Sequence, residues 1–168
     1  MSRKGDPMVR RVGRRGQTRR AALAGLAAAA VFGGRRLAAE PASMVTVWKD
    51  PNCGCCSGWV DHLRRSGFTV AAIDTADLAA VKAALGVPGE LASCHTAKID
   101  AYVIEGHVPA AAIRRLLAER PAALGLAVSG MPIGSPGMEG GTPQLYDVIL
   151  FAAQSTMVYG RFIGSEPR

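Results

Sequence analysis

The sequence predicts an α/β fold in which a central mixed sheet is flanked by helices, with a C-terminal β-hairpin. Strand-like and helix-like segments alternate from about residue 44 to residue 128, and two β-like runs follow. A Cys-x-x-Cys pair, Cys53 and Cys56, lies at the turn from the first predicted strand to the first predicted helix. This order of elements, with such a pair at that turn, is typical of a thioredoxin-like domain.

The first two strand–helix units are delimited by glycines. Gly67 and Gly86 follow the two predicted helices, as C-terminal glycines commonly do. The elements are a strand at 45–48, a helix at 57–66 with Trp59, Val60 and Leu63 on one face, a strand at 68–73, and a helix that is capped by Asp74-Thr75 and carries Leu78, Val81 and Leu85.

The rest of the chain predicts one more such unit and the hairpin. A loop is expected at 87–97, a strand at 99–104, and a helix at 110–120 between Pro109 and Pro121. Residues 130–141 are rich in glycine, proline and methionine, which excludes a long helix or a central strand there. The runs 145–151 and 156–162 predict the hairpin.

The positive charge is concentrated in the first 39 residues, which have the parts of an export signal. Of a total charge of +7, these residues carry +9, which leaves −2 for residues 40–168 and argues against a nucleic-acid partner. A basic stretch (1–20) precedes an apolar run (21–32) that is too short to span a bilayer comfortably. Thr18-Arg19-Arg20 resembles a twin-arginine signal.

The leader predicts two parts of the chain and a location. Residues 1–39 are expected to be a disordered or helical, twin-arginine-like export signal with cleavage near Ala39, and residues 40–168 a thioredoxin-like metal-binding domain. The expected location is the periplasm, and membrane contact is expected only in passing, through the signal. The alternative is an uncleaved amphipathic or disordered basic tail.

Four cysteines carry the candidate chemistry: Cys53, Cys55, Cys56 and Cys94. A helix N-terminus beside Cys53 and Cys56 favours thiolates, which are both better nucleophiles and better metal ligands. Cys55 would invite mixed disulfides beside a redox pair, whereas Cu(I) prefers several thiolates. Three hypotheses stay open: a Cu(I) site of four cysteines, a thiol–disulfide oxidoreductase that uses Cys53 and Cys56, and a structural disulfide domain.

A few other soft or borderline donors accompany the cysteines. Candidates for direct ligands, or for groups that orient the sulfurs, are His95, His107, Met131 and Met138. Met131-Pro132 lies where thioredoxin-like folds place a cis-proline beside the Cys-x-x-Cys pair, which would bring Met131 towards the sulfurs. We expect His62 to be a helix-edge residue, and Met44 and Met157 to pack in the core or in strands.

Other metals and cofactors are less well supported by the sequence. Zinc sites usually show two Cys-x-x-Cys knuckles, and only one is present, so zinc is less favoured than copper. Carboxylates do not cluster as calcium or magnesium sites require. Phosphate-loop, Gly-x-Ser-x-Gly and dinucleotide motifs are absent from the sequence.

Four segments resemble one known family. They are 49–56 (Lys-Asp-Pro-Asn-Cys-Gly-Cys-Cys), 93–97 (Ser-Cys-His-Thr-Ala), 102–109 (Tyr-Val-Ile-Glu-Gly-His-Val-Pro) and 130–139 (Gly-Met-Pro-Ile-Gly-Ser-Pro-Gly-Met-Glu). With them, residues 44–163 resemble the domain of unknown function 411 family, which includes CopG-type proteins of periplasmic copper resistance.

The resemblance implies a fold, a location and a metal. It implies a thioredoxin-like domain outside the cytoplasm that binds copper through Cys53, Cys55, Cys56 and Cys94. It further implies a small Cu(I)–thiolate cluster with redox handling of copper. The expected partners are copper ions and other periplasmic copper-handling proteins.

Overall fold

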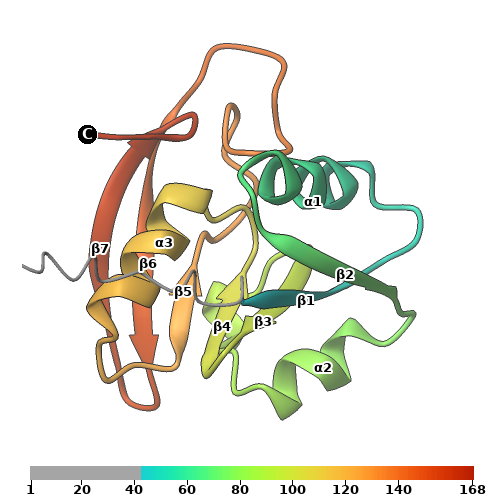
Figure 1. Ribbon diagram of the computed structural model, residues 1–168, viewed down its shortest axis with the longest axis vertical. Coiled ribbons are helices and arrows are strands. Elements are labelled where there is room, and N and C mark those ends of the chain that lie inside the picture. The colour runs from blue at the N-terminus through green and yellow to red at the C-terminus, as the bar shows by residue number, and fades with distance from the viewer. Residues whose placement is uncertain (1–42) are drawn as a thin grey trace, which may run out of the picture. The chain divides into compact units, whose positions relative to one another are not determined.

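The computed structural model describes residues 43–168, so the predictions about residues 1–39 lie outside the described part (Figure 1). The elements in chain order are β1 (Met44–Lys49), α1 (Gly54–Arg65), β2 (Thr69–Asp74), α2 (Leu78–Ala84), the 3₁₀ turn η1 (Gly89–Leu91), β3 (His95–Ile99), β4 (Tyr102–Glu105), α3 (Ala110–Glu119), β5 (Gly125–Ala127), β6 (Leu145–Ala152), β7 (Ser155–Ile163) and β8 (Glu166–Pro167). None of the helices in residues 43–168 has the length and hydrophobicity that a membrane-spanning segment needs.

All eight strands of this part of the chain form one mixed sheet, in the order β2-β1-β3-β4-β5-β6-β7-β8. β1 pairs with β2 and β4 pairs with β5 in parallel, and the other neighbours are antiparallel. The predicted α/β class and mixed sheet are therefore confirmed. The predicted hairpin is β6–β7, whose strands are longer than the runs 145–151 and 156–162.

The two faces of the sheet bury separate apolar clusters. α1 and α3 cover one face with Trp59, Leu63, Ile113 and Leu116, all fully buried, and the Trp59 indole N–H donates to the Val108 carbonyl at 2.9 Å. α2 and η1 lie on the other face, and Figure 1 shows α1 and α2 on opposite sides of the β1–β2 pair. Full burial of one such side chain stabilises the fold by roughly 1.5–3 kcal/mol. Because this gain requires apolar residues on one side of α1, the buried face could be predicted from the helical spacing of Trp59, Val60 and Leu63.

The predicted strand at 99–104 is wrong, because the chain reverses in the middle of it. Asp100 has a positive φ of 51°, and with Ala101 it forms a tight turn between β3 and β4. β3 therefore begins earlier, at His95, where the sequence predicted a loop over 87–97, and it pairs with β1 from Lys49 onwards. Aspartate tolerates this left-handed conformation, but an apolar run around it hides the turn.

The short strands β5 and β8 were not predicted. β5 contains Gly125, a residue that is unfavourable in strands, yet a Cβ atom there would lie only 1.8 Å from the Val103 carbonyl oxygen. Close backbone contact between β4 and β5 therefore requires glycine at this position. β8 has two residues, too few for any periodic pattern.

The predicted cap of the second helix is also wrong. Asp77, and not Asp74-Thr75, caps α2, since its side chain accepts from the Ala80 N–H at 2.9 Å. Asp74 instead ends β2 and binds the Lys49 ammonium at 2.8 Å. The third helix ends at Glu119, one residue before its predicted end, where Arg120 enters the left-handed region ahead of Pro121.

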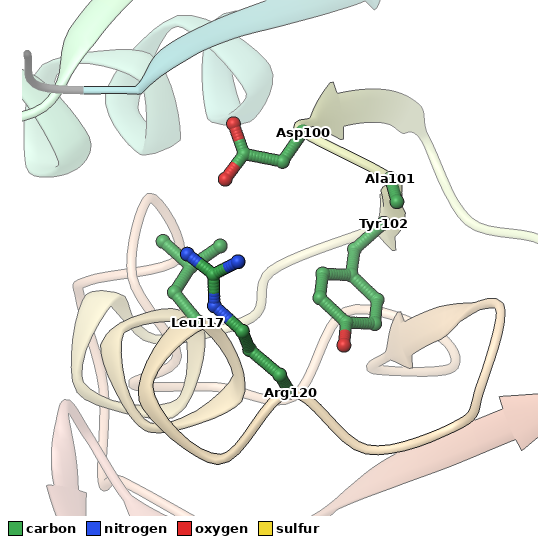
Figure 2. Close-up of a pocket in the computed structure, with 5 residues that line it drawn as sticks. All are labelled: Asp100, Ala101, Tyr102, Leu117 and Arg120. Carbon is green, nitrogen blue, oxygen red and sulfur yellow. The ribbon is translucent and has the colours of Figure 1, made fainter.

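A cavity of about 120 Å³ lies beside the β3–β4 turn and is lined by Asp100, Ala101, Tyr102, Leu117 and Arg120 (Figure 2). The Asp100 carboxylate and the Arg120 guanidinium project from the turn and from the end of α3. The turn lies at the end of β3 and β4 away from His95 and Glu105. This cavity is therefore separate from the cysteines.

Candidate metal centre

The chain enters α1 through a tight turn that is held by Asp50 and that points one backbone N–H at a cysteine sulfur. The Cys53 N–H donates to the Asp50 carbonyl at 3.1 Å, and the Asn52 N–H donates to the Asp50 carboxylate at 2.7 Å. Cys53 is the N-cap, and its sulfur accepts from the Cys56 N–H at 3.3 Å. The helix therefore begins at Gly54, and not at 57 as predicted, because a cysteine takes the capping position that serine or aspartate usually fills.

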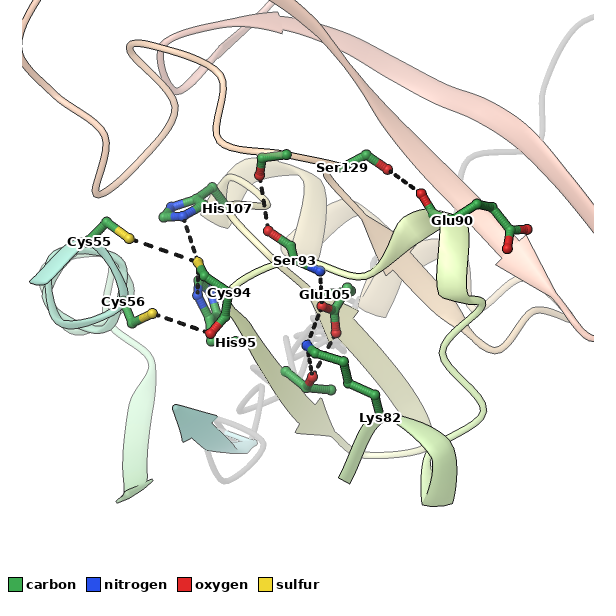
Figure 3. A network of polar contacts seen from close by, with 12 residues as sticks. Cys55, Cys56, Lys82, Glu90, Ser93, Cys94, His95, Glu105, His107 and Ser129 are labelled. Carbon is green, nitrogen blue, oxygen red and sulfur yellow. Dashed lines mark hydrogen bonds and ion pairs between the residues drawn. The ribbon is translucent and has the colours of Figure 1, made fainter. Parts of the chain in front are cut away.

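The structure brings the four cysteine sulfurs together, with all of them within 4.8 Å of one another. A disulfide joins Cys53 to Cys56, and Cys55 and Cys94 are free thiols. The Cys55 Sγ lies 3.4 Å from the Cys53 Sγ and 3.9 Å from the Cys94 Sγ. Figure 3 shows Cys55 and Cys56 projecting from α1 towards Cys94, which precedes β3.

Two buried histidines stand beside Cys94 on its other side. The Cys94 Sγ lies 3.3 Å from the His95 Nδ1 and 3.1 Å from the His107 Nε2 (Figure 3). The His107 Nδ1 lies 2.8 Å from the Pro136 carbonyl oxygen, which can only accept, so this nitrogen carries the proton and Nε2 keeps its lone pair. The His107 Nε2 is thus free to accept from the Cys94 thiol or to bind a metal.

His95 is held in place mainly by packing. It is fully buried, and its ring lies 4.4 Å from the Trp59 ring and 5.0 Å from the His107 ring, measured between centroids. Its Nε2 atom has no hydrogen-bond partner among the described residues. Together with Cys94 and His107 it forms a second group of donors within 4.8 Å of one another, which shares Cys94 with the four sulfurs.

Burial favours the uncharged forms of Cys94, His95 and His107. It raises the pKa of the Cys94 thiol to about 12, and the nearby Cys55 adds to this shift. It lowers the pKa of His95 to about 3, with further lowering by His107 and Lys82, and it also lowers the pKa of His107. A bound cation would therefore displace the thiol proton, so that metal binding releases protons.

The pKa of His95 predicts that the metal-free protein loses stability in mild acid. Between pH 6.5 and about 3, the unfolded chain binds a proton on His95 that the folded chain excludes, so stability falls as pH drops below 6.5. From about pH 7 to about pH 5 the loss from this residue is about 2 kcal/mol. Urea unfolding at both pH values checks this, with His95→Gln as the variant that cannot titrate there. Equal pH dependence in the two proteins would contradict the assignment.

The other predicted donors lie outside these groups. The His62 Nε2 accepts from the Ala110 N–H at 3.1 Å at the start of α3, consistent with the expected helix-edge residue. Met131 is 53% exposed, and Met138 is partly buried in the loop that contacts α1 through Gly137. Met44 and Met157 were expected in the core or in strands, and both lie in strands, where they are 58% and 61% exposed and so are not part of the core.

A polar network on the far side of the Cys94 segment was not predicted. Glu105, which is fully buried, binds Lys82, Thr96 and the Ser93 backbone (Figure 3). The sequence signal was an acidic residue at the end of the apolar run Tyr102–Glu105. A buried carboxylate needs partners, which the sequence could not name.

Comparisons with known proteins find one family and two similar solved structures. The profile of the family described as "Protein of unknown function, DUF411" matches residues 91–138, which include Cys94, His95 and His107. Two solved structures, titled as forms 1 and 2 of copper resistance protein copG, are similar to this chain at 46% sequence identity with a TM-score of 0.69. The similarity covers 73% of this chain and 98% and 99% of theirs. No match is found among curated proteins.

Proposed function

Since the chain belongs to the DUF411 family together with copper resistance protein copG, we propose that it is an exported copper-binding protein that acts in copper resistance or homeostasis. In this proposal it holds Cu(I), in one or more ions, through Cys53, Cys55, Cys56 and Cys94. The observation that carries the proposal is the group of four cysteine sulfurs within 4.8 Å of one another.

The chemistry of the donors favours copper over other metals. Soft thiolates select Cu(I), and thiolate sulfur shields it from harder competing ligands. Tetrahedral zinc would also accept four thiolates, but here three of the four donors come from one four-residue segment, whereas zinc sites usually use two paired knuckles. His95 and His107 lie against Cys94 and would either ligate the metal or orient that sulfur.

The Cys53–Cys56 disulfide gives the proposal a redox component. With the disulfide formed, only Cys55 and Cys94 are free thiols, so a site of four thiolates requires its reduction. Two Cu(I) ions supply the two electrons that break the S–S bond and become two Cu(II) ions, while two protons complete the thiols. In the reverse direction the dithiol reduces two Cu(II) ions to Cu(I) and closes the disulfide.

Location and fold type belong to the same proposal. The basic and apolar leader supports export to the periplasm by a twin-arginine route, with copper delivered to or received from other periplasmic copper-handling proteins. The β1–α1–β2 unit with a Cys-x-x-Cys pair at its first turn supports a thioredoxin-like domain.

A second candidate function is thiol–disulfide exchange on protein substrates. The observation in its favour is that Cys53 and Cys56 form the disulfide at the N-terminus of α1. Efficient reduction of insulin disulfides, retained in the Cys55→Ser/Cys94→Ser variant, would favour this function over copper binding.

The test of copper binding is an anaerobic titration of the fully reduced protein with Cu(I), followed by elemental analysis. Because four thiolates can bridge more than one soft ion, we expect more than one copper per chain. Less than one copper per chain, with a competing chelator in modest excess, would contradict the proposal.

A further inference from the structure

We propose that Glu105 is the positioning residue of the site, and that it fixes Cys94 and His107 relative to each other from the opposite face of the sheet. The inference rests on the proposed function for its copper component, but its structural component stands without metal. Lys82 and Thr96 bind the Glu105 carboxylate and hold it in place.

The alternation of side chains puts Glu105 on the face away from the cysteines. In β4, Tyr102 and Ile104 belong to the cluster beneath α1 and α3, whereas Val103 belongs to the cluster on the α2 side. Glu105 therefore points to the α2 side. In β3, Thr96 is its cross-strand partner and points to the same side, while His95 points to the α1 side.

The Glu105 carboxylate is saturated with partners although it is fully buried. The Lys82 ammonium lies 2.5 Å from Oε1, and the Thr96 hydroxyl donates to Oε2 at 2.7 Å. The Ser93 backbone N–H donates to Oε1 at 2.6 Å. Lys82 and Thr96 also bind each other at 2.8 Å, which fixes the carboxylate from two sides.

The hydrogen bond from the Ser93 N–H connects the Glu105 carboxylate to the proposed metal site. Ser93 directly precedes Cys94, so the carboxylate fixes the backbone that carries the thiol. Glu105 is itself two residues before His107, so its own backbone sets the position of the imidazole. The Glu105 carbonyl accepts from the Val128 N–H at 3.0 Å, which anchors that backbone to the residue directly after β5.

The residue between Glu105 and His107 has no room for a side chain. Gly106 has a φ of +69°, and a Cβ atom there would lie 2.5 Å from the Val128 carbonyl and 2.7 Å from the Ser93 hydroxyl. The Gly106 N–H donates to the His95 carbonyl at 3.0 Å, and the Ser93 hydroxyl donates to the Gly130 carbonyl at 3.0 Å. Glu105 thus holds Cys94 by its side chain and His107 by its main chain, which sets the 3.1 Å distance between their Sγ and Nε2 atoms.

Two matched double variants isolate the hydrogen bond to Ser93. Glu105→Gln/Lys82→Met removes the ion pair but keeps an oxygen that accepts from the Ser93 N–H. Glu105→Met/Lys82→Met removes that acceptor as well, and replacing a buried ion pair by apolar side chains of similar volume is often well tolerated. The two variants carry the same charge and nearly the same volume.

The metal-free readout is alkylation by iodoacetamide of the protein with its Cys53–Cys56 disulfide intact. Cys55 and Cys94 are then the reactive thiols, and Cys55 serves as the internal reference. We expect the rate for Cys94 relative to Cys55 to rise about tenfold in Glu105→Met/Lys82→Met and to stay within about twofold of wild type in Glu105→Gln/Lys82→Met. Val103→Ala, on the same face of β4, controls for general loss of stability and should leave the ratio unchanged.

Equal Cys94 rates in the two double variants would overturn the proposal. If the methionine variant does not fold, hydrogen exchange in the wild-type protein decides: a Ser93 amide that exchanges as fast as an unprotected loop amide overturns the proposal, and a protected one supports it. In the copper readout, we expect Cu(I) affinity to fall about tenfold in the methionine variant and to be kept in the glutamine variant. If wild-type protein binds no Cu(I), the proposed function fails, while the alkylation ratio still tests the positioning role.

Discussion

Replacing Cys94 by serine is expected to lower both the number of Cu(I) ions bound per chain and the affinity for them. Cys94 is the one sulfur among the described cysteines that does not come from residues 53–56, and it lies between the Cys55 thiol at 3.9 Å and the His107 Nε2 at 3.1 Å. A hydroxyl is a hard ligand that Cu(I) binds poorly. The affinity loss should exceed the roughly tenfold to hundredfold loss that is typical of removing an outer-shell partner.

Anaerobic Cu(I) titration with a competing chelator measures both quantities. His62→Gln is the matched control, because it also removes a donor atom, but one that caps α3 instead of facing the sulfurs. We expect the His62 variant to bind copper as wild type does. An unchanged copper stoichiometry in Cys94→Ser would show that the second segment does not contribute to the cluster.

Replacing Gly137 by alanine is expected to destabilise the protein and to loosen His107. Gly137 has a φ of +89°, and a Cβ atom there would lie 2.5 Å from the Cys55 carbonyl oxygen and 2.7 Å from the Trp59 backbone nitrogen. The positive φ costs an alanine about 1 kcal/mol, and overpacking adds roughly 1–3 kcal/mol. The loop must then move away from α1, and Pro136, whose carbonyl accepts from the His107 Nδ1, moves with it.

Gly140→Ala separates the cost of the positive φ from the cost of overpacking. Gly140 has a φ of +114°, but no atom lies within 4 Å of its Cβ position. Urea unfolding should show a loss in Gly137→Ala that exceeds the loss in Gly140→Ala by about the overpacking energy of 1–3 kcal/mol. Cu(I) affinity should fall only in Gly137→Ala. Equal unfolding free energies for the two variants would mean that the loop does not depend on its contact with α1.

The sequence predicted those parts of the fold that periodic burial determines. The apolar face of α1, with Trp59 and Leu63, and the β6–β7 hairpin both follow from side-chain period, and both were found. The reversal at Asp100 was missed because a two-residue turn with a single polar residue is too short to separate β3 from β4 in the sequence pattern. His95 was therefore expected in a loop, although it begins a buried strand beside Lys49.

The clustering of the cysteines was predictable from the sequence, but the contacts that hold the cluster in place were not. Three cysteines within four residues and Cys94-His95 are visible in the sequence, and the structure brings them together. Glu105 could not be chosen from the sequence, because its role depends on Thr96 as its cross-strand partner and on Lys82 from α2. Such contacts are set by sheet register, which one sequence does not specify.

The central claim is that the four cysteine sulfurs act as one Cu(I) site, and the most direct test is the anaerobic Cu(I) titration of wild-type protein in two redox states. Reduced protein offers four thiols, whereas protein with the Cys53–Cys56 disulfide intact offers Cys55 and Cys94. Because the proposed electron transfer from Cu(I) would open the disulfide, the comparison uses only samples in which mass spectrometry after the titration still finds Cys53 and Cys56 joined. We predict more than one copper per chain in the reduced protein and a clear loss of stoichiometry in the disulfide form. Less than one copper per reduced chain, or equal binding by both forms, would contradict a site built from all four sulfurs.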